Sequence, residues 1–570
     1  MNVADPLRKP LPALHSNPKR SFLRFFSIIL VIANLTSIIL STLFLLNIEF
    51  MIPNVFGIIL LFTLLGNIAL AGIPGDRKKY DLFYLNFTIL VMTLLPVFNT
   101  MASVSLSNTD SLSFVSIFLL FSLLVLGGLI ALIKRGDQTL IRFDSRFPVQ
   151  ISQERHFSKA AIITMFFWSL CLLGGIYVAF VLLVGKTGGA IEMIFPGYTL
   201  FFCIGTLAIV SLILRMGSGK NRGVVASIIL PIIGFVVAAC FSVPVISTLL
   251  SLEKTEGAFV EAFGDRLDSR FESESSDYFL TSTFSLPNYF FGTKTGKYIV
   301  KEDILFYEGV EGVDEGIQLR FDAYLPPDGS NPLPGNNSVL IRIHGGGWTI
   351  GDKGASNNAQ VNKYFANQGY VVFDVQYGLS SEDRFVEFAP VPEQRVGDFT
   401  IDDMVRHIGL FTDYLVEHND EFQGDLDSVF VSGASAGGQL ASAVGLGLAS
   451  GNYEDVLNPE LHVKGIIPIY PANGLAGNVG IGGSEALVDP ALLVKEDSPP
   501  ALIFQGTADG VVDLSVAETF ANMYRNNNNQ GSVLLEMPYA GHNGDFYFSS
   551  YYNQVFIYYM ERFMYLHRRM

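Results

Sequence analysis

The sequence predicts an α-helical membrane domain of about seven spans, followed by an α/β domain with a mostly parallel sheet and helices on both of its faces. Long apolar stretches fill the first half, whereas short β-branched runs alternate with helical runs in the second. The charge changes at the same place: residues 1–251 hold 18 Lys and Arg against 9 Asp and Glu, and residues 252–570 hold 19 against 44. The two halves are therefore suited to different surroundings.

The composition of the whole chain excludes several classes of protein. Its 570 residues are 50% hydrophobic and 16% charged, whereas soluble domains carry about a quarter charged residues. That deficit excludes a disordered tail, a coiled coil and a purely soluble enzyme. The acidic second half disfavours nucleic acid as a partner, and the sequence names no protein partner. All three cysteines fall in predicted spans, and the Cys/His spacing typical of metal sites is missing.

Seven apolar stretches each reach the roughly 20 residues that cross a hydrocarbon core about 30 Å thick. None contains Asp, Glu, Lys, Arg or His. Because ion pathways normally use ionisable groups at membrane depth, the stretches favour an anchor, or lateral access for a substrate, over a transporter. Gly127–Gly128 and Gly174–Gly175 are interpreted as helix-packing contacts. The predicted spans cover residues 25–47, 52–73, 82–104, 111–133, 160–185, 193–214 and 223–252.

The basic residues around these spans predict an orientation. Of the 18 Lys and Arg in residues 1–251, 17 fall in the N-terminal tail and in every second loop, and only Lys186 falls in the alternate loops. Cytoplasmic loops carry such an excess, so the tail, residues 1–24, is predicted to be cytoplasmic. Seven crossings of the transmembrane domain, residues 25–252, then leave the rest of the chain on the extracytoplasmic side.

The second half is predicted to fold as an α/β domain over residues 298–570. Residues 253–297, acidic and Ser-rich and then aromatic, are a linker or a cap. Short strand-like runs separated by helices indicate a mostly parallel sheet with covered faces. The strand-like runs are 298–307, 317–324, 338–344, 370–376, 428–432, 463–469, 501–505 and 532–537. The helical runs include 355–368, 401–418, 436–449, 514–525 and 547–567.

A serine stands at the turn between one of these strands and the following helix. The sequence there is Gly433-Ala434-Ser435-Ala436-Gly437. Small flanking residues let the backbone close tightly around Ser435, and the helix N-terminus favours a developing oxyanion. The alternative is a tight turn with a purely structural role, but the strand–turn–helix context favours Ser435 as a nucleophile.

Three further features follow predicted strands. His344-Gly345-Gly346-Gly347-Trp348 ends one strand, and its glycines leave backbone N–H groups able to approach a substrate oxygen. Asp509 lies in a Gly-rich turn after strand 501–505, and His542 lies in a glycine-flanked loop after the last strand. A carboxylate of this kind can orient a histidine and stabilise its cation. The alternative histidines are His407, His418, His462 and His567.

The order of these residues points to one fold. Asp509 follows Ser435 by 74 residues and His542 follows Asp509 by 33, and serine, aspartate, histidine is the order of the α/β-hydrolase fold. Residues from about 298 to the end resemble the α/β-hydrolase superfamily, in particular its esterase/lipase branch with the H-G-G-G motif, which includes hormone-sensitive-lipase-like enzymes and carboxylesterases. His344 to Trp348, followed by Gly351-Asp352-Lys353, is similar to the small-ester hydrolases and formamidases of that branch.

The resemblance implies a role for each of these residues. Ser435 would be the nucleophile, His542 the general base and Asp509 its orienting partner. The N–H groups of Gly345, Gly346 and Ala436 would form an oxyanion hole, and no metal or organic cofactor is required. The chain departs from many relatives after the fourth strand, where Asp374-Val375-Gln376-Tyr377-Gly378 replaces an Asp-Tyr-Arg-Leu run, which affects the expected acyl pocket.

The sequence therefore predicts a multi-pass membrane serine esterase that acts on a small ester or a lipid. Two other hypotheses remain. An acyltransferase would use the same triad and pass the acyl group to an acceptor reached through the membrane half. A seven-span receptor or transporter would carry a non-catalytic hydrolase-like module, although the complete triad and the charge-free spans disfavour it. A peptidase is disfavoured because no gating partner domain is evident.

Overall fold

The computed structural model describes residues 18–48, 53–74, 77–135, 159–217, 228–264, 278–327, 333–382, 384, 386, 389 and 391–568. Within these residues the chain forms two compact units. One comprises the described residues up to Val91 and those within Leu119–Leu172 and Ile204–Phe235. The other comprises Met92–Phe118, Leu173–Cys203 and the described residues from Val236 onward. The second unit thus holds parts of several long helices together with the whole α/β domain.

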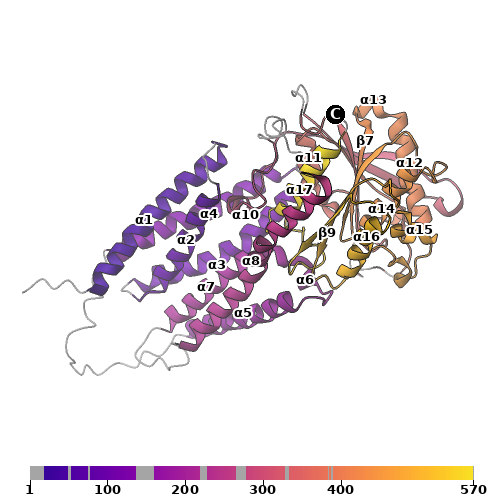
Figure 1. Ribbon diagram of the computed structural model, residues 1–570. Helices are drawn as coiled ribbons and strands as arrows, with labels where there is room; N and C mark the ends of the chain where they lie inside the picture. The colour runs from indigo at the N-terminus through magenta and orange to yellow at the C-terminus, as the bar shows by residue number, and fades with distance from the viewer. Residues whose placement is uncertain are drawn as a thin grey trace, which may run out of the picture. The chain divides into compact units, whose positions relative to one another are not determined.

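Seven helices in the described part of the chain are long and apolar enough to cross a membrane (Figure 1). They match the seven predicted spans, with differences at the ends. Helix α1 begins inside the predicted tail, and the first residues of the last predicted span, 223–227, lie outside the described residues. The helices are α1 (Pro18–Leu45), α2 (Pro53–Gly72), α3 (Lys78–Val104), α4 (Thr109–Arg135), α5 (Lys159–Val184), α7 (Thr199–Met216) and α8 (Leu230–Phe263).

Polar contacts join the helices of the first unit. Asp81 of α3 is buried and forms ion pairs of 2.9 Å with Lys134 of α4 and Arg215 of α7. Asn34 of α1 and Asn67 of α2 exchange two amide hydrogen bonds, of 3.0 and 2.9 Å. If these helices did not pack together, the buried charges and amides would lose their partners, which is energetically costly. These contacts therefore favour this particular pairing of helices.

The two glycine pairs in the spans behave differently. A Cβ added at Gly127 would lie 2.1 Å from the amide nitrogen of Asn67, so this glycine allows the close packing that was predicted. At Gly174 and Gly175 an added Cβ would meet no atom within 4 Å in the described part of the chain. Within the described part of the chain that pair therefore makes no such packing contact, and the interpretation stays a prediction there.

The second half of the chain builds an eight-stranded sheet in the order β1-β2-β4-β3-β7-β8-β9-β10. Strand β2 pairs antiparallel with β1 and with β4, and every other pair in the sheet is parallel. The predicted α/β-hydrolase fold is confirmed, and all eight predicted strands are present. They are β1 (Ile299–Glu308), β2 (Gln318–Leu325), β3 (Ser338–Ile343), β4 (Val371–Val375), β7 (Asp425–Ala434), β8 (Val463–Ile469), β9 (Ala501–Gly506) and β10 (Ser532–Met537). A separate two-stranded sheet pairs β5 (Leu379–Ser380) with β6 (Val396–Gly397).

Helices cover both faces of the sheet (Figure 1), and side chains alternate between the two faces along each strand. Val429 and Val431 of β7 belong to a core that includes residues of α12 (Ile401–Glu417), α14 (Ala436–Ser450) and α16 (Leu514–Asn526). Phe430, between them, contacts Phe563 of α17 (Tyr551–His567) on the other face. Helix α11 (Ala359–Asn367) begins four residues later than predicted, because residues 354–357 form a 3₁₀ turn. Helix α17 also begins four residues later, where Ser550 accepts a hydrogen bond from the N–H of Asn553.

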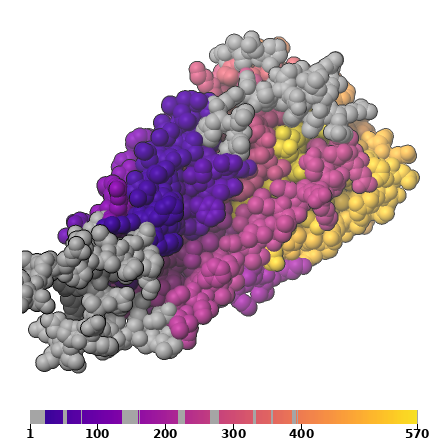
Figure 2. Space-filling model, turned by 60° about the vertical axis from the view of Figure 1, so that its left-hand side comes forward, coloured from indigo at the N-terminus to yellow at the C-terminus, as the bar shows by residue number. Residues whose placement is uncertain are grey.

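Residues 253–297, predicted as a linker or cap, include a continuation of α8. The helix runs 11 residues past the predicted end of the span, to Phe263, and lies beside α17 (Figure 2). Glu256 accepts a 2.8 Å hydrogen bond from the hydroxyl of Tyr559. The short helix α10 (Leu286–Phe291) then buries Tyr289 and Phe290. The described residues of this segment thus pack against α17 and the span ends of the second unit.

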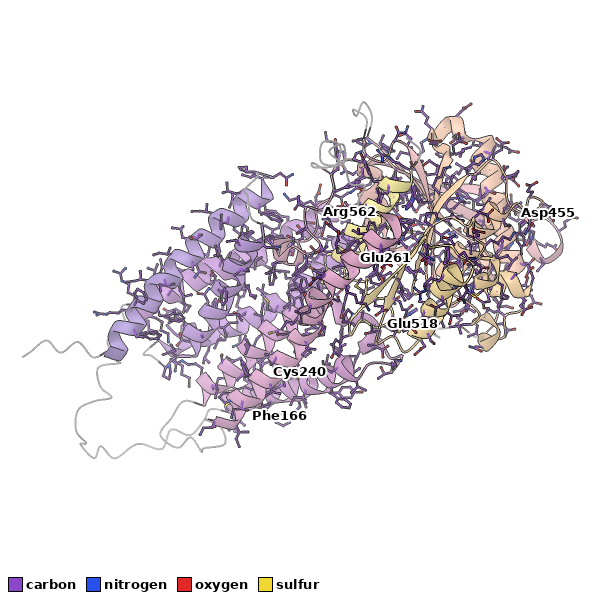
Figure 3. All side chains as sticks on the ribbon, in the orientation of Figure 1. Phe166, Cys240, Glu261, Asp455, Glu518 and Arg562 are labelled. Atoms are coloured by element: carbon purple, nitrogen blue, oxygen red, sulfur yellow. The ribbon has the colours of Figure 1, made fainter. Side chains whose placement is uncertain are left out.

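A cleft of about 800 Å³ separates the continuation of α8 from α16 and β10. Glu261 of α8 and Glu518 of α16 both line it (Figure 3). Strand β10 is the last strand of the sheet, so its outer edge faces this cleft. The residues that line the cleft do not include Ser435, Asp509 or His542.

Glu561 of α17 is a carboxyl group buried under the sheet. It accepts hydrogen bonds from the hydroxyl of Tyr364 at 2.7 Å, from the side-chain amide of Gln368 at 2.6 Å and from the N–H of Leu280 at 3.0 Å. Burial raises the pKa of Glu561 to about 7, because the charged form loses its hydration there. The group therefore ties α11, α17 and residue 280 together.

This burial predicts a pH effect on stability. Between its unfolded pKa of about 4.3 and its folded pKa, Glu561 is protonated in the folded state and ionised in the unfolded state. Stability then falls as pH rises through this window, by about 3–4 kcal/mol in total once the pH exceeds both pKa values. The variant Glu561→Gln should lose less stability than the wild type between pH 5 and pH 8 in thermal unfolding of the full chain in detergent. Equal losses for both chains would contradict the assignment.

Candidate active site

Ser435 occupies a strained turn between β7 and α14. Its φ of 57° and ψ of −121° are sparsely populated for a residue with a side chain. The strain persists because the neighbouring glycines let the backbone pack around it. A Cβ at Gly433 would lie 2.1 Å from the carbonyl oxygen of Gly437, and one at Gly437 would lie 2.2 Å from that of Ile343. The G-x-S-x-G spacing thus presents the hydroxyl at the end of the strand.

The structure brings together the three side chains that the sequence selected. His542 Nε2 lies 3.0 Å from Ser435 Oγ, and His542 Nδ1 lies 2.9 Å from Asp509 Oδ2. All three residues are buried, and Ser435 keeps 8% of its surface exposed. Both contacts have hydrogen-bond length, so a proton on the hydroxyl can pass to Nε2 while Nδ1–H donates to the carboxylate.

The carboxylate of Asp509 is held by three further donors. The N–H groups of Val511 and Val512 donate to Oδ1 at 2.8 and 2.9 Å, and the side-chain amide of Gln505 donates to Oδ2 at 3.1 Å. With His542, these groups satisfy both oxygens of a carboxylate that is almost fully buried. The turn after β9 therefore fixes the orientation of the acid before any substrate arrives.

The Gly-rich turn after β3 lies against the serine. A Cβ added at Gly345 would be 3.3 Å from the Cβ of Ser435 and 2.6 Å from the carbonyl oxygen of Ala434. Gly346 has a φ of 120°, which glycine alone adopts readily. Among the residues that the structure describes, no backbone acceptor takes the N–H of Gly345, Gly346 or Ala436. These three N–H groups are thus available for a substrate oxygen.

Buried side chains support this turn. The ring of His344 stacks on that of Tyr377 at 4.4 Å, and burial lowers the pKa of His344 to about 4. Trp348 donates a 2.9 Å hydrogen bond to Gln439 of α14. Tyr377 comes from the segment 374–378 in which the sequence departs from many relatives, and here it supports the Gly-rich turn after β3. Gln439, which ties that turn to the serine helix, gave no signal in the sequence.

The alternative histidines have partners of their own. His407 lies 2.9 Å from Asp314, and His462 lies 2.9 Å from Asp427. His418 stacks on Tyr414, and His567 packs against Phe563. The described residues contain no group of three or more His, Cys, Asp or Glu that could hold a metal ion.

One residue beside His542 was missed by the sequence analysis. The ring of Tyr470 lies 4.5 Å from the imidazole of His542, and its hydroxyl donates to Asp545 at 2.7 Å. Tyr470 follows directly after β8, so it shares the strand-end position that identified the others. Buried tyrosines are common in protein cores, so the residue type alone did not mark Tyr470 as part of the site.

Several known proteins that are similar to this domain are named as esterases. Residues 321–478 match the family described as BD-FAE. The chain is 22% identical over 232 residues to the probable carboxylic ester hydrolase LipM of Mycobacterium tuberculosis, covering 37% of this chain and 50% of LipM. It is 22% identical over 244 residues to the probable isoprenylcysteine alpha-carbonyl methylesterase ICMEL1 of Arabidopsis thaliana, covering 38% of this chain and 47% of that protein.

Solved structures of esterases are also partly similar to this chain. Esterase 2 of Thermogutta terrifontis is 23% identical, with 47% of this chain and 92% of that chain covered and a TM-score of 0.35. The chain spans about half the length of the curated relatives it matches. The second half thus has an α/β-hydrolase fold, and curated proteins similar to it carry esterase names. In this chain the domain follows seven helices long and apolar enough to span a membrane.

The tight packing around the serine turn predicts the effect of one methyl group. The change Gly437→Ala places a Cβ 2.2 Å and 2.4 Å from two backbone carbonyl oxygens, which cannot move aside. We expect the free energy of unfolding to fall by about 1–3 kcal/mol, and labelling of Ser435 by a fluorophosphonate to slow about 100-fold.

The matched control is Gly447→Ala on the same helix. There the new Cβ meets the tip of the Leu457 side chain at 3.0 Å and the ring of Tyr453 at 3.5 Å, and no backbone atom stands among its nearest contacts. This variant should label at the wild-type rate. Equal labelling of the Gly437→Ala variant would contradict the packing argument.

Proposed function

We propose that this chain is a membrane-anchored serine hydrolase that cleaves carboxylic esters through an acyl-enzyme. The observation that carries the proposal is the chain of two hydrogen bonds from Asp509 through His542 to Ser435. The esterase names of the relatives support the ester as the substrate class. The apolar helices support an integral, multi-pass attachment.

The first step follows from the geometry. As Ser435 Oγ forms a bond to the ester carbonyl carbon, its proton passes to His542 Nε2, 3.0 Å away. Asp509 accepts the Nδ1–H hydrogen bond, so it selects the tautomer whose Nε2 carries a free lone pair, and then stabilises the imidazolium. The carbonyl oxygen becomes an oxyanion, for which the N–H groups of Gly345, Gly346 and Ala436 are the proposed donors.

Collapse of the tetrahedral intermediate then breaks the bond to the alkoxy group. His542 Nε2–H gives its proton to the departing oxygen, and an alcohol leaves with the acyl group on Ser435. Water repeats the sequence: His542 takes its proton, hydroxide attacks the acyl carbon, and the acid is released as Ser435 recovers its proton. Every proton transfer uses the same nitrogen, so no other acid or base is required.

The proposed substrate is a small ester or a lipid, and the hydrolase domain is proposed to lie on the extracytoplasmic side. The distribution of basic residues supports this orientation, because 17 of 18 fall in the tail and alternate loops. With an odd number of crossings, the N-terminal tail and the hydrolase domain lie on opposite sides of the membrane.

Removal of the nucleophile tests the mechanism. Ser435→Ala should lower the hydrolysis of p-nitrophenyl acyl esters about 10,000-fold or more and abolish fluorophosphonate labelling, and Asp509→Asn should lower hydrolysis by a similar factor. The control is Ser442→Ala, which removes a buried hydroxyl from α14, the helix that follows Ser435. This variant should hydrolyse the ester at the wild-type rate. Full hydrolysis by the Ser435→Ala variant would refute the proposal, and acyl transfer to an added alcohol that outpaces hydrolysis would favour an acyltransferase.

A reporter fusion tests the orientation. Alkaline phosphatase, which is active only outside the cytoplasm, should be active when fused after residue 570 and inactive when inserted in the loop between α4 and α5. The expectation rests on the positive-inside rule. The reverse pattern of activities would contradict it.

A further inference from the structure

The loop between α5 and α7, which includes the short helix α6 (Ala190–Ile194) that carries Glu192, lies directly on the turn that carries Asp509. The N–H of Lys186 donates to the carbonyl oxygen of Ala508 at 2.8 Å. A Cβ at Gly185 would lie 2.5 Å from the Cβ of Ala508, and one at Gly510 would lie 2.3 Å from the nitrogen of Gly188. Both segments belong to the second compact unit. The two backbones therefore touch without room for intervening side chains.

Glu192 is the acidic residue of this loop, and only 1% of it is exposed. Its Oε1 accepts the N–H of Gly510 at 2.6 Å. Its Oε2 accepts the hydroxyl of Thr187 at 2.8 Å and the N–H of Gly188 at 3.1 Å, and the N–H of Thr187 also donates to it. One oxygen thus holds the loop itself, and the other holds the residue next to Asp509.

The same residue also contacts the histidine loop. A Cβ at Gly541 would lie 2.5 Å from Cγ of Glu192 and 2.4 Å from its carbonyl oxygen. Gly541 immediately precedes His542. Glu192 therefore lies between the neighbour of the acid and the neighbour of the base, although it comes from a loop between two predicted membrane spans more than 300 residues earlier in the chain.

We propose that Glu192 is a positioning residue of the hydrolase site, through which the loop between α5 and α7 becomes part of the active site. The proposal rests on the proposed function of Ser435, Asp509 and His542. A buried carboxylate is costly unless its oxygens are hydrogen-bonded, and here the bonds join the loop to the acid turn. The acid and the histidine come from separate strand ends, and Glu192 braces both.

The change Glu192→Gln tests this role while it preserves the size of the side chain. One carboxylate oxygen becomes an NH₂ group, which cannot accept from Gly510 or from the Thr187 loop. The acid turn should then lose its fixed position, and small displacements of a catalytic group cost up to about 100-fold in rate. We expect kcat to fall about 10- to 100-fold with KM within twofold, and fluorophosphonate labelling to slow by the same factor.

The control removes a contact of the same loop that does not reach the triad. Lys186 and Asp513 form an ion pair of 2.9 Å in which both side chains are more than half exposed. Lys186→Ala removes only this exposed side-chain pair and keeps the backbone bond from Lys186 to Ala508, so kcat should stay within twofold of wild type. If the loop only docked the two segments, Glu192→Gln and Lys186→Ala would change kcat by similar factors. If Glu192 positions the site, only Glu192→Gln lowers kcat.

A second variant keeps the test decisive if Glu192→Gln does not fold. Thr187→Val removes one hydrogen bond to Oε2 and leaves the Gly510 bond in place, so a loss of kcat of about threefold to tenfold is expected. All variants are measured as the full chain in detergent, with thermal unfolding as a check on folding. A folded Glu192→Gln or Thr187→Val chain with wild-type kcat and labelling rate would overturn the proposal. An inactive, unlabelled wild-type chain would overturn the proposed function itself.

Discussion

The structure of the second half depends on one constraint: a buried carboxylate, an imidazole and a hydroxyl must meet within hydrogen-bond distance although they come from three separate turns. The parallel sheet meets this constraint because β7, β9 and β10 run in the same direction and end at the same edge. The turn after each of these strands carries one of the three side chains. Parallel pairing thus converts a spacing of 107 residues between Ser435 and His542 into a contact of 3.0 Å.

Burial of these three side chains means that their polar atoms must find hydrogen-bond partners within the protein. Asp509 is ionised in the proposed mechanism and is almost completely covered, so each of its oxygens needs donors. The chain supplies them from Gln505 and from two backbone N–H groups of the same turn. Glu192 adds a further contact to this turn, because its carboxylate accepts the N–H of Gly510, the residue directly after Asp509. The acid turn is therefore fixed from inside the sheet and from the loop outside it.

Much of this could be predicted from local patterns in the sequence. The strands follow from short β-branched runs, and Ser435, Asp509 and His542 follow from their chain order and their positions after strands. Other features depend on contacts between distant segments and leave no local pattern. Glu192 is a single acidic residue beside an apolar span, the continuation of α8 to Phe263 is stabilised by packing against Tyr559, and Gln439 is an ordinary helix residue whose partner is Trp348. Gly174 and Gly175 show the converse, since a small-residue pattern occurs there without a packed neighbour in the described part of the chain.

These contacts bear on why a hydrolase domain is joined to membrane helices at all. If the helices were only an anchor, a flexible linker would suffice, and the site would be complete without them. Instead, α5 ends at Val184, and only two residues later the backbone of Lys186 is bonded to Ala508 in the acid turn. In the proposed topology, where α5 spans a bilayer, that turn lies at the surface of the membrane, and the proposed lipid substrate would need to travel little to reach Ser435. The same contacts mean that the region 298–570 taken alone would lack Glu192 and would expose the face of α17 that α8 covers, so the proposed hydrolase site depends on residues outside that region.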